Sequence, residues 1–286
     1  MNLLVLGPGS SLNHDSELIV RCSSSMTTLA FQNVFPNCLT HFGIIPDIWL
    51  SGDPNAYMEG FHFLLNNIND KDLFQNMEIL IPSMFTRGLV EYRRYCGTTP
   101  LLRSPGAWNL FEYYLGEINK HYKVRVVECT TTKFLKTSGS ELNSRIFDLD
   151  SYERFMHHTS ILGTVEFDNE SVIGDRYKWG LENKLTSIVF PFAYNLNFKN
   201  IYIAGFDFQG PRFYSDDARH PWSDETQKEN VAHFPLTIVE KWVQWNRLHG
   251  MKFTSVVKNE LTLLNKVLPY QDLRNIIQGV NNVQSI

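Results

Sequence analysis

The sequence predicts an α/β protein built on one mostly parallel β-sheet. Short apolar segments alternate with helical segments along the 286 residues, which is typical of βαβ units. Most of the apolar segments end in glycine, serine or aspartate, as expected where the carboxyl edges of parallel strands line a shared crevice. Because a chain of this length fits one large domain, we expect a single domain over residues 1–286.

The first part of the chain is predicted to supply four strands and one helix. Each strand is a short run of apolar residues closed by small or polar ones. The predicted strands are 3–6, 17–22, 46–51 and 77–81. The break Gly52-Asp53-Pro54 precedes an aromatic-rich helix expected over 56–66.

The rest of the chain is predicted to continue the alternation. Residues 185–196 are apolar nearly all round, and they are assigned to a buried helix interrupted by Pro191. The other assignments are a helix at 104–120, a strand at 122–128, a loop at 130–143, a strand at 200–208, a helix at 234–249, a strand at 251–257 and a closing helix at 259–277.

The first strand is followed by the turn Gly7-Pro8-Gly9-Ser10-Ser11-Leu12. Glycines let a backbone pass close to a ligand, and successive amides in such a turn can hold an anion. The spacing matches neither the dinucleotide fingerprint GxGxxG nor the Walker phosphate loop. A plain β-turn therefore remains an alternative to a phosphate site.

Composition excludes some partners and leaves others open. A net charge of −4 lacks the basic footprint that nucleic-acid binding requires. The four cysteines are scattered without metal-site spacing, which favours reduced thiols. The apolar run at the start is too short for a signal peptide or a membrane span, so we expect a cytoplasmic protein. Peripheral contact with the inner face of the membrane and a homo-oligomer both remain open.

The segment 200–208 is the best candidate for the centre of a site. It is predicted to be a buried strand that ends at Gly205 and Asp207, and a long polar stretch follows it as far as His233. In α/β proteins, ligands bind at the carboxyl end of such a strand. We expect residues 208–233 to form a lid-like insertion.

These motifs, in their order along the chain, resemble the bacterial sialyltransferases of glycosyltransferase family 42. The residues that carry the resemblance are 7–12, Arg21-Cys22, Gly52-Asp53-Pro54, Thr186-Ser187, 201–208, Tyr214 and His233. The resemblance implies a Rossmann-like domain, a variant of the GT-A type, with a small lid. It also implies a CMP-activated sugar donor and no metal or other cofactor. The stretch 43–54 additionally resembles motility-associated glycosyltransferases and pterin diphosphokinases.

The resemblance implies three catalytic roles and a nucleotide-sugar site. His233 is the general base, Tyr214 donates to the leaving phosphate, and Lys184 stands where the family has an arginine. The implied nucleotide-sugar site consists of Gly7, Pro8, Gly9, Ser10, Ser23, Asp53, Ser187, Gly205, Asp207, Gln209 and Asn259.

The expected activity is inverting transfer of a sialic-acid-like keto-sugar acid from a CMP donor to a glycan or glycolipid acceptor. Pro8, Ser23 and Asp53 stand where the family has asparagine, and Gln209 stands where it has tyrosine. Three alternatives therefore stay open. They are a Kdo-type transferase, a magnesium-dependent pterin-type diphosphokinase with Asp53 and Asp207 as ligands, and an inactive nucleotide-sugar-binding relative.

Several of these residues also have structural interpretations. A histidine before a helix is often a cap, and His220 in the same polar stretch is a second candidate base. Tyr214 could pack on the lid, and Asp207 could bind backbone amides at the strand end. The abundant aromatic residues fit either core packing, which is commoner, or an exposed contact platform. They include Trp49, Tyr57, Phe61, Phe63 and Trp108.

Overall fold

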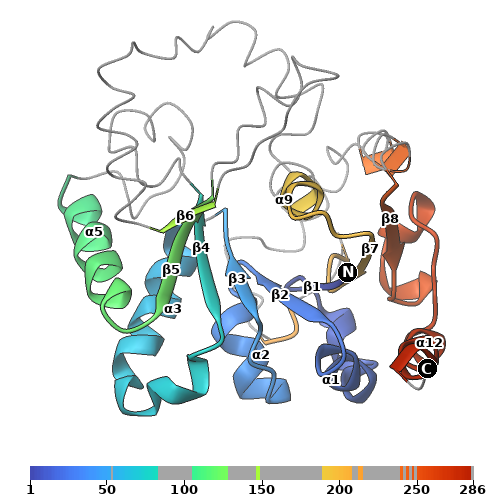
Figure 1. The fold of residues 1–286 in the computed structure, drawn as a ribbon, viewed down its shortest axis with the longest axis horizontal. Coiled ribbons are helices and arrows are strands. Elements are labelled where there is room, and N and C mark those ends of the chain that lie inside the picture. The colour runs from blue at the N-terminus through green and yellow to red at the C-terminus, as the bar shows by residue number, and fades with distance from the viewer. Residues whose placement is uncertain are drawn as a thin grey trace, which may run out of the picture.

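The fold is an α/β Rossmann-like arrangement in which helices flank one β-sheet (Figure 1). The computed structural model describes residues 1–52, 54–82, 105–127, 146–148, 189–207, 212–214, 239–240, 243–244, 247 and 250–284. The strands are β1 (Asn2–Leu6), β2 (Thr27–Phe31), β3 (Ile48–Leu50), β4 (Glu78–Pro82), β5 (Lys123–Val127), β6 (Ile146–Asp148), β7 (Asn200–Ala204) and β8 (Lys252–Ser255). The α-helices are α1 (Ser16–Ser23), α2 (Val34–Phe42), α3 (Pro54–Asn66), α5 (Pro105–Asn119), α9 (Phe190–Asn195) and α12 (Leu273–Gln284). The predicted α/β Rossmann-like class with a mostly parallel sheet is confirmed.

The sheet is ordered β6-β5-β4-β3-β2-β1-β7-β8, and every pair is parallel except β5 with β6. The chain therefore starts at an inner strand, adds β2 to β5 on one side, and returns to place β7 on the other side of β1 (Figure 1). Asn2 pairs with Asn200 and Leu6 with Ala204, so β1 and β7 end level with each other. Their carboxyl ends form the topological switch point of the sheet.

Two hydrophobic layers cover the sheet because strand residues alternate between its faces. Leu4 and Leu6 of β1 face a layer shared with α1, α2, α3, α5 and α12. Leu3 and Val5 face the opposite layer, which contains α9 and the helical residues Val239 and Val243. Burial on both faces explains why the parallel strands read as continuous apolar runs.

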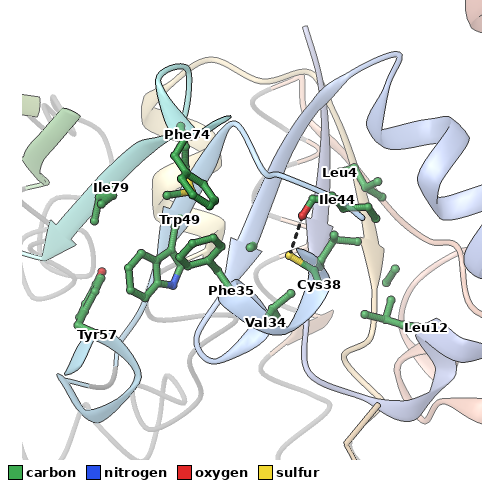
Figure 2. Close-up of a cluster of buried hydrophobic side chains, with 14 of the residues drawn as sticks. Leu4, Leu12, Val34, Phe35, Cys38, Ile44, Trp49, Tyr57, Phe74 and Ile79 are labelled. Carbon is green, nitrogen blue, oxygen red and sulfur yellow. Dashed lines mark hydrogen bonds between the residues drawn. The ribbon is translucent and has the colours of Figure 1, made fainter. Parts of the chain in front are cut away.

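Trp49 belongs to the first layer, and it is fully buried. Its ring centroid lies 4.9 Å from that of Phe35 and 5.0 Å from that of Tyr57 (Figure 2). The Tyr57 hydroxyl accepts a hydrogen bond from the Ser51 amide at 2.7 Å and donates to the Leu80 carbonyl. These aromatic residues therefore belong to the core and tie the end of β3 to β4, which excludes them from an exposed platform.

The helices and strands predicted before residue 128 agree with the structure, except around residues 17–22. That segment is α1, and the second strand is β2, which sequence reasoning did not predict. A helix is required here because parallel neighbouring strands need a crossover connection. Ile19 and Cys22, three positions apart, form its buried face. Helix α2 and the short antiparallel strand β6 were also not predicted.

Agreement is mixed in the second half. Helix α9 lies within the predicted 185–196 helix, and the described residues of 234–249 are helical where the predicted helix lies. The prediction of a closing helix at 259–277 is wrong in its first half. Residues Asn259–Leu261 and Leu264–Lys266 are 3-10 turns (η6 and η7), and the Pro269 carbonyl accepts the Ser255 amide at 2.9 Å before α12 begins. Proline lacks an amide and interrupts a helix interior. The predicted loop 130–143 lies outside the described residues.

Cys22 and Cys38 are free, buried thiols. Burial raises the pKa of Cys22 to about 11 and the pKa of Cys38 to about 12, so both stay protonated near neutrality. The Cys38 thiol donates to the Ile44 carbonyl at 3.4 Å (Figure 2). None of the helices in the described ranges is long and apolar enough to span a membrane.

Two helical glycines give a matched test of this packing. A Cβ atom at Gly60 in α3 would overlap the Trp49 indole, whereas one at Gly116 in α5 would meet nothing within 4 Å. We expect Gly60→Ala to destabilise the fold by about 1–3 kcal/mol through overpacking. Gly116→Ala should stabilise it by about 0.5–1 kcal/mol, because alanine favours a helix. Urea unfolding of both variants measures these changes. Stabilisation by Gly60→Ala would contradict the packing described for Trp49.

Candidate functional site

The candidate site lies at the switch point, where the carboxyl ends of β1 and β7 touch. Gly205 has a φ of 71°, a left-handed conformation that glycine adopts most readily, and a Cβ on it would overlap the Gly7 carbonyl. A Cβ atom at Gly7 would lie 2.5 Å from the Gly205 carbonyl oxygen. The Gly7 amide donates to the Ala204 carbonyl at 2.8 Å. The two backbones can meet this closely only because neither residue carries a side chain.

The amides of the glycine turn are mostly used inside the protein. The Gly9 amide donates to the Gly205 carbonyl at 2.7 Å, and the Leu12 amide donates to the Gly9 carbonyl at 3.3 Å. The Ser11 amide binds Asp207 at 2.9 Å. In the described part of the chain, the Ser10 amide is the one amide of this turn without an acceptor. The turn therefore packs against β7, and few of its amides are left to hold an anion as its sequence had suggested.

Asp207 links three segments of the site, and its side chain is buried. The Ser11 hydroxyl donates to Asp207 Oδ1 at 2.5 Å and the Ser11 amide to Oδ2 at 2.9 Å. The backbone carbonyl of Asp207 accepts the Leu263 amide at 3.0 Å, and the Thr262 hydroxyl donates to the Phe206 carbonyl at 3.1 Å. Both carboxylate oxygens thus bind the turn, which favours the structural interpretation of Asp207.

The environment of Asp207 sets its protonation. Burial raises its pKa to about 6, while the two Ser11 hydrogen bonds and the positive charge of His14 oppose that rise. A carboxyl with this pKa can change charge near neutral pH. At pH 7 it is mostly ionised, and the Ser11 donors are what stabilise the buried charge.

Residues 212–214, within the predicted insertion, return to the glycine turn. Arg212 forms an antiparallel bridge with Gly9, and the Phe213 amide donates to the Pro8 carbonyl at 3.0 Å. The Phe213 ring lies 5.0 Å from that of Phe42. These contacts hold residues 212–214 against the glycine turn at the switch point.

Arg212 and Tyr214 form a polar pair at this point. Arg212 Nη1 donates to the Tyr214 hydroxyl at 2.7 Å, and its guanidinium carbon lies 5.8 Å from the centroid of the Tyr214 ring. Burial raises the pKa of Tyr214, and Arg212 opposes the rise. Tyr214 therefore stays protonated, with its own hydrogen available to a further acceptor.

Sequence reasoning missed Arg212 and Thr262. The signal for Arg212 was an arginine two positions before the candidate Tyr214. No sequence pattern pointed to Thr262, because its role depends on the carbonyl of Phe206.

The other predicted site residues divide into three groups. Asn259 begins the 3-10 turn η6 after β8, near the segment that binds the Asp207 carbonyl. Ser23 lies at the far end of α1, where its carbonyl accepts the Thr28 hydroxyl at 3.4 Å near the start of β2. The structure does not bring Ser23 to the switch point, because residues 17–22 are helix and not a strand. The remaining candidates, Asp53, Lys184, Ser187, Gln209 and His233, lie outside the described residues.

Comparison with protein-family models, curated proteins and solved structures finds no match for this chain. Within the described ranges, no three His, Cys, Asp or Glu side chains gather where they could hold a metal ion.

Replacing Asp207 tests its environment through the pH dependence of stability. Because the folded-state pKa is raised to about 6, the contribution of this group is fully present below pH ~4 and is lost as the pH rises through 6. The loss amounts to about 3 kcal/mol. Asp207→Asn should abolish this loss, so its stability relative to wild type should increase between pH 4 and 7 in urea unfolding. Ser11→Ala should move the wild-type transition to higher pH. Parallel profiles for wild type and Asp207→Asn would contradict a raised pKa.

Proposed function

We propose that this protein is a glycosyltransferase that moves a sialic-acid-like keto-sugar acid from a CMP-activated donor to a glycan or glycolipid acceptor. The observation that carries the proposal is the convergence of distant segments at the switch point. The turn at 7–12, the strand end at 205–207, the 212–214 segment and residues 262–263, which follow the turn beginning at Asn259, meet there. These segments also carry much of the resemblance to family 42.

The chemistry of such a transfer explains which groups the site needs. The sugar becomes oxocarbenium-like as the bond to CMP breaks, and negative charge grows on the leaving phosphate. Hydrogen-bond donors stabilise that charge. In this proposal the donors are the Tyr214 hydroxyl, the free N–H groups of Arg212 and the Ser10 amide, together with Lys184.

The acceptor hydroxyl must lose a proton when it attacks. In this proposal His233 takes that proton, because an imidazole titrates near neutral pH. Asp53, Ser187, Gln209 and Asn259 are assigned to the nucleotide-sugar from the resemblance. In this proposal the enzyme acts in the cytoplasm.

A nucleotide-sugar-binding protein without turnover is the second candidate. The specific observation in its favour is that the glycine turn and the Asp207 carboxylate are both occupied within the protein. Fewer donors would then face the leaving phosphate. Binding of the CMP-sugar without release of CMP distinguishes this candidate from the transferase.

A ligand panel tests the nucleotide. CMP, CDP, UDP, ADP and GTP, each with and without magnesium, are compared by thermal shift, because a ligand at 100 times its Kd stabilises the folded state by about 2.7 kcal/mol. We expect selective stabilisation by CMP without magnesium. Arg212→Gln should weaken CMP binding about tenfold, the loss expected for a charge-assisted hydrogen bond. Arg274→Gln, at an exposed arginine of α12, is the matched control. A response confined to ADP or GTP with magnesium would reject the CMP donor and favour the diphosphokinase.

His233→Ala tests the general base. Transfer should fall by about 100-fold or more, as expected when a positioned base is removed, while the Kd for CMP should stay within twofold, or about 0.4 kcal/mol. CMP release from CMP-sialic acid in the presence of an acceptor glycan measures the transfer. His121→Ala, at an exposed histidine after α5, provides the control. Wild-type rates in His233→Ala would remove His233 from the mechanism and leave His220 as the next base to test.

A further inference from the structure

A second candidate binding site lies at the opposite edge of the sheet from the switch point. A cavity of about 330 Å3 opens at the start of β8, beside Gly250, Met251 and Lys252. Because Lys252 pairs with Asn200, the first residue of β7, this is the amino edge of the sheet. The volume lies at the lower end of the range for small-molecule pockets.

The inner wall of the cavity is apolar. Val243, Met251 and Phe253 line it, and each is less than a tenth exposed. Gly250, with a φ of 74°, contributes no side chain, and a Cβ atom built on it would meet no atom of the described residues within 4 Å. An apolar group placed against this wall would be removed from water, which favours binding.

Two cations stand at the opening. Arg247 and Lys252 both line the cavity, and both are exposed. Within the described ranges, neither is held in an ion pair or a side-chain hydrogen bond. Glu240, the described acidic residue of the same helical segment, does not line the cavity. A guanidinium and an ammonium that line one cavity favour a carboxylate or phosphate.

The free edge of β8 adds a backbone donor. The amides of Lys252 and Val256 point toward β7, where they donate to Lys199 and Ile203. The alternation of a strand therefore turns the amide and carbonyl of Phe253 outward. The Pro269 carbonyl and the Gln271 amide satisfy the equivalent outward groups of Ser255. At Phe253 the described part of the chain supplies no such partner, which leaves an amide that a ligand oxygen can bind.

We propose that this cavity binds a small organic anion with an apolar body. The body packs on Met251 and Phe253, and the carboxylate or phosphate lies between Arg247, Lys252 and the Phe253 amide. A free aryl or acyl anion and the acid group of a single-chain lipid share this chemistry. The site is separate from the proposed nucleotide-sugar site, and the inference does not depend on the proposed function.

The test uses 1-naphthyl phosphate as the probe. 1-Naphthol, which lacks the charge, and inorganic phosphate, which lacks the apolar ring, are the comparison ligands. Binding to the full chain is measured by calorimetry. We expect 1-naphthyl phosphate to bind at least about tenfold more tightly than either counterpart. The double variant Arg247→Gln/Lys252→Gln should lose about tenfold in affinity, because it removes both charged donors. Arg21→Gln/Lys71→Gln makes the same charge change at two exposed residues that do not line the cavity.

Several outcomes decide the proposal. Equal affinity of wild type and the Arg247→Gln/Lys252→Gln variant overturns it, as does tighter binding of inorganic phosphate than of 1-naphthyl phosphate. Loss of binding in Arg212→Gln but not in the cavity variant moves the ligand to the switch point and also overturns it. If the wild type floats with phosphatidylcholine vesicles that contain lysophosphatidate and the cavity variant does not float, the ligand is a lipid. If the wild type binds 1-naphthyl phosphate but does not float with these vesicles, the ligand is a free anion. Melting temperatures equal to the control variant's show that the cavity variant is folded.

Discussion

The backbones of β1 and β7 meet at Gly7 and Gly205 with no side chain between them, and the site is arranged around that contact. The contact brings Asp207, just beyond β7, within hydrogen-bonding distance of Ser11 in the turn after β1. A side chain at either glycine would separate the two strand ends. The same contact uses the amides of Gly7 and Gly9, so these two donors are already bound within the protein.

Asp207 makes this contact a junction of three segments, which are the glycine turn after β1, the end of β7 and the segment after β8. Its carboxylate holds the glycine turn, and its carbonyl holds the segment that follows β8. The junction depends on a buried charge whose pKa is about 6, so its strength depends on pH. The junction occupies its own polar groups. Arg212 and Tyr214 add polar groups beside it, since residues 212–214 reach the glycine turn.

The two edges of the sheet differ in chemistry as well as in place. At the carboxyl edge, backbone groups and one buried carboxylate bind each other, and Arg212 donates to the Tyr214 hydroxyl. At the amino edge, the end of β8 leaves Arg247, Lys252 and the Phe253 amide around an apolar cavity. In parallel sheets ligands usually bind at the carboxyl edge. In the described part of the chain β8 is the last strand of the sheet, and Ser255 is the residue whose outward backbone groups are bonded, to Pro269 and Gln271.

Apolar runs closed by small residues were sufficient to predict the fold class and the positions of β1, β3, β4, β7 and β8. Burial on both faces makes such strands uniformly apolar, so a local pattern carries the information. The same pattern misassigned residues 17–22, because a one-sided helix and a buried strand look alike over six residues.

The sequence by itself determined the alternation of strands and helices, the glycine turn and the candidate strand end at Asp207. Tertiary structure decided which of these meet. The pairing of Ser11 with Asp207 spans 196 positions in the chain, and it arises from placing β7 beside β1. The place of Ser23 at the far end of α1 and the role of Arg212 depend equally on chain path. Local sequence preferences depend on neighbouring residues and carry no information on contacts between distant ones. The residues that share a site are therefore known only from the tertiary structure.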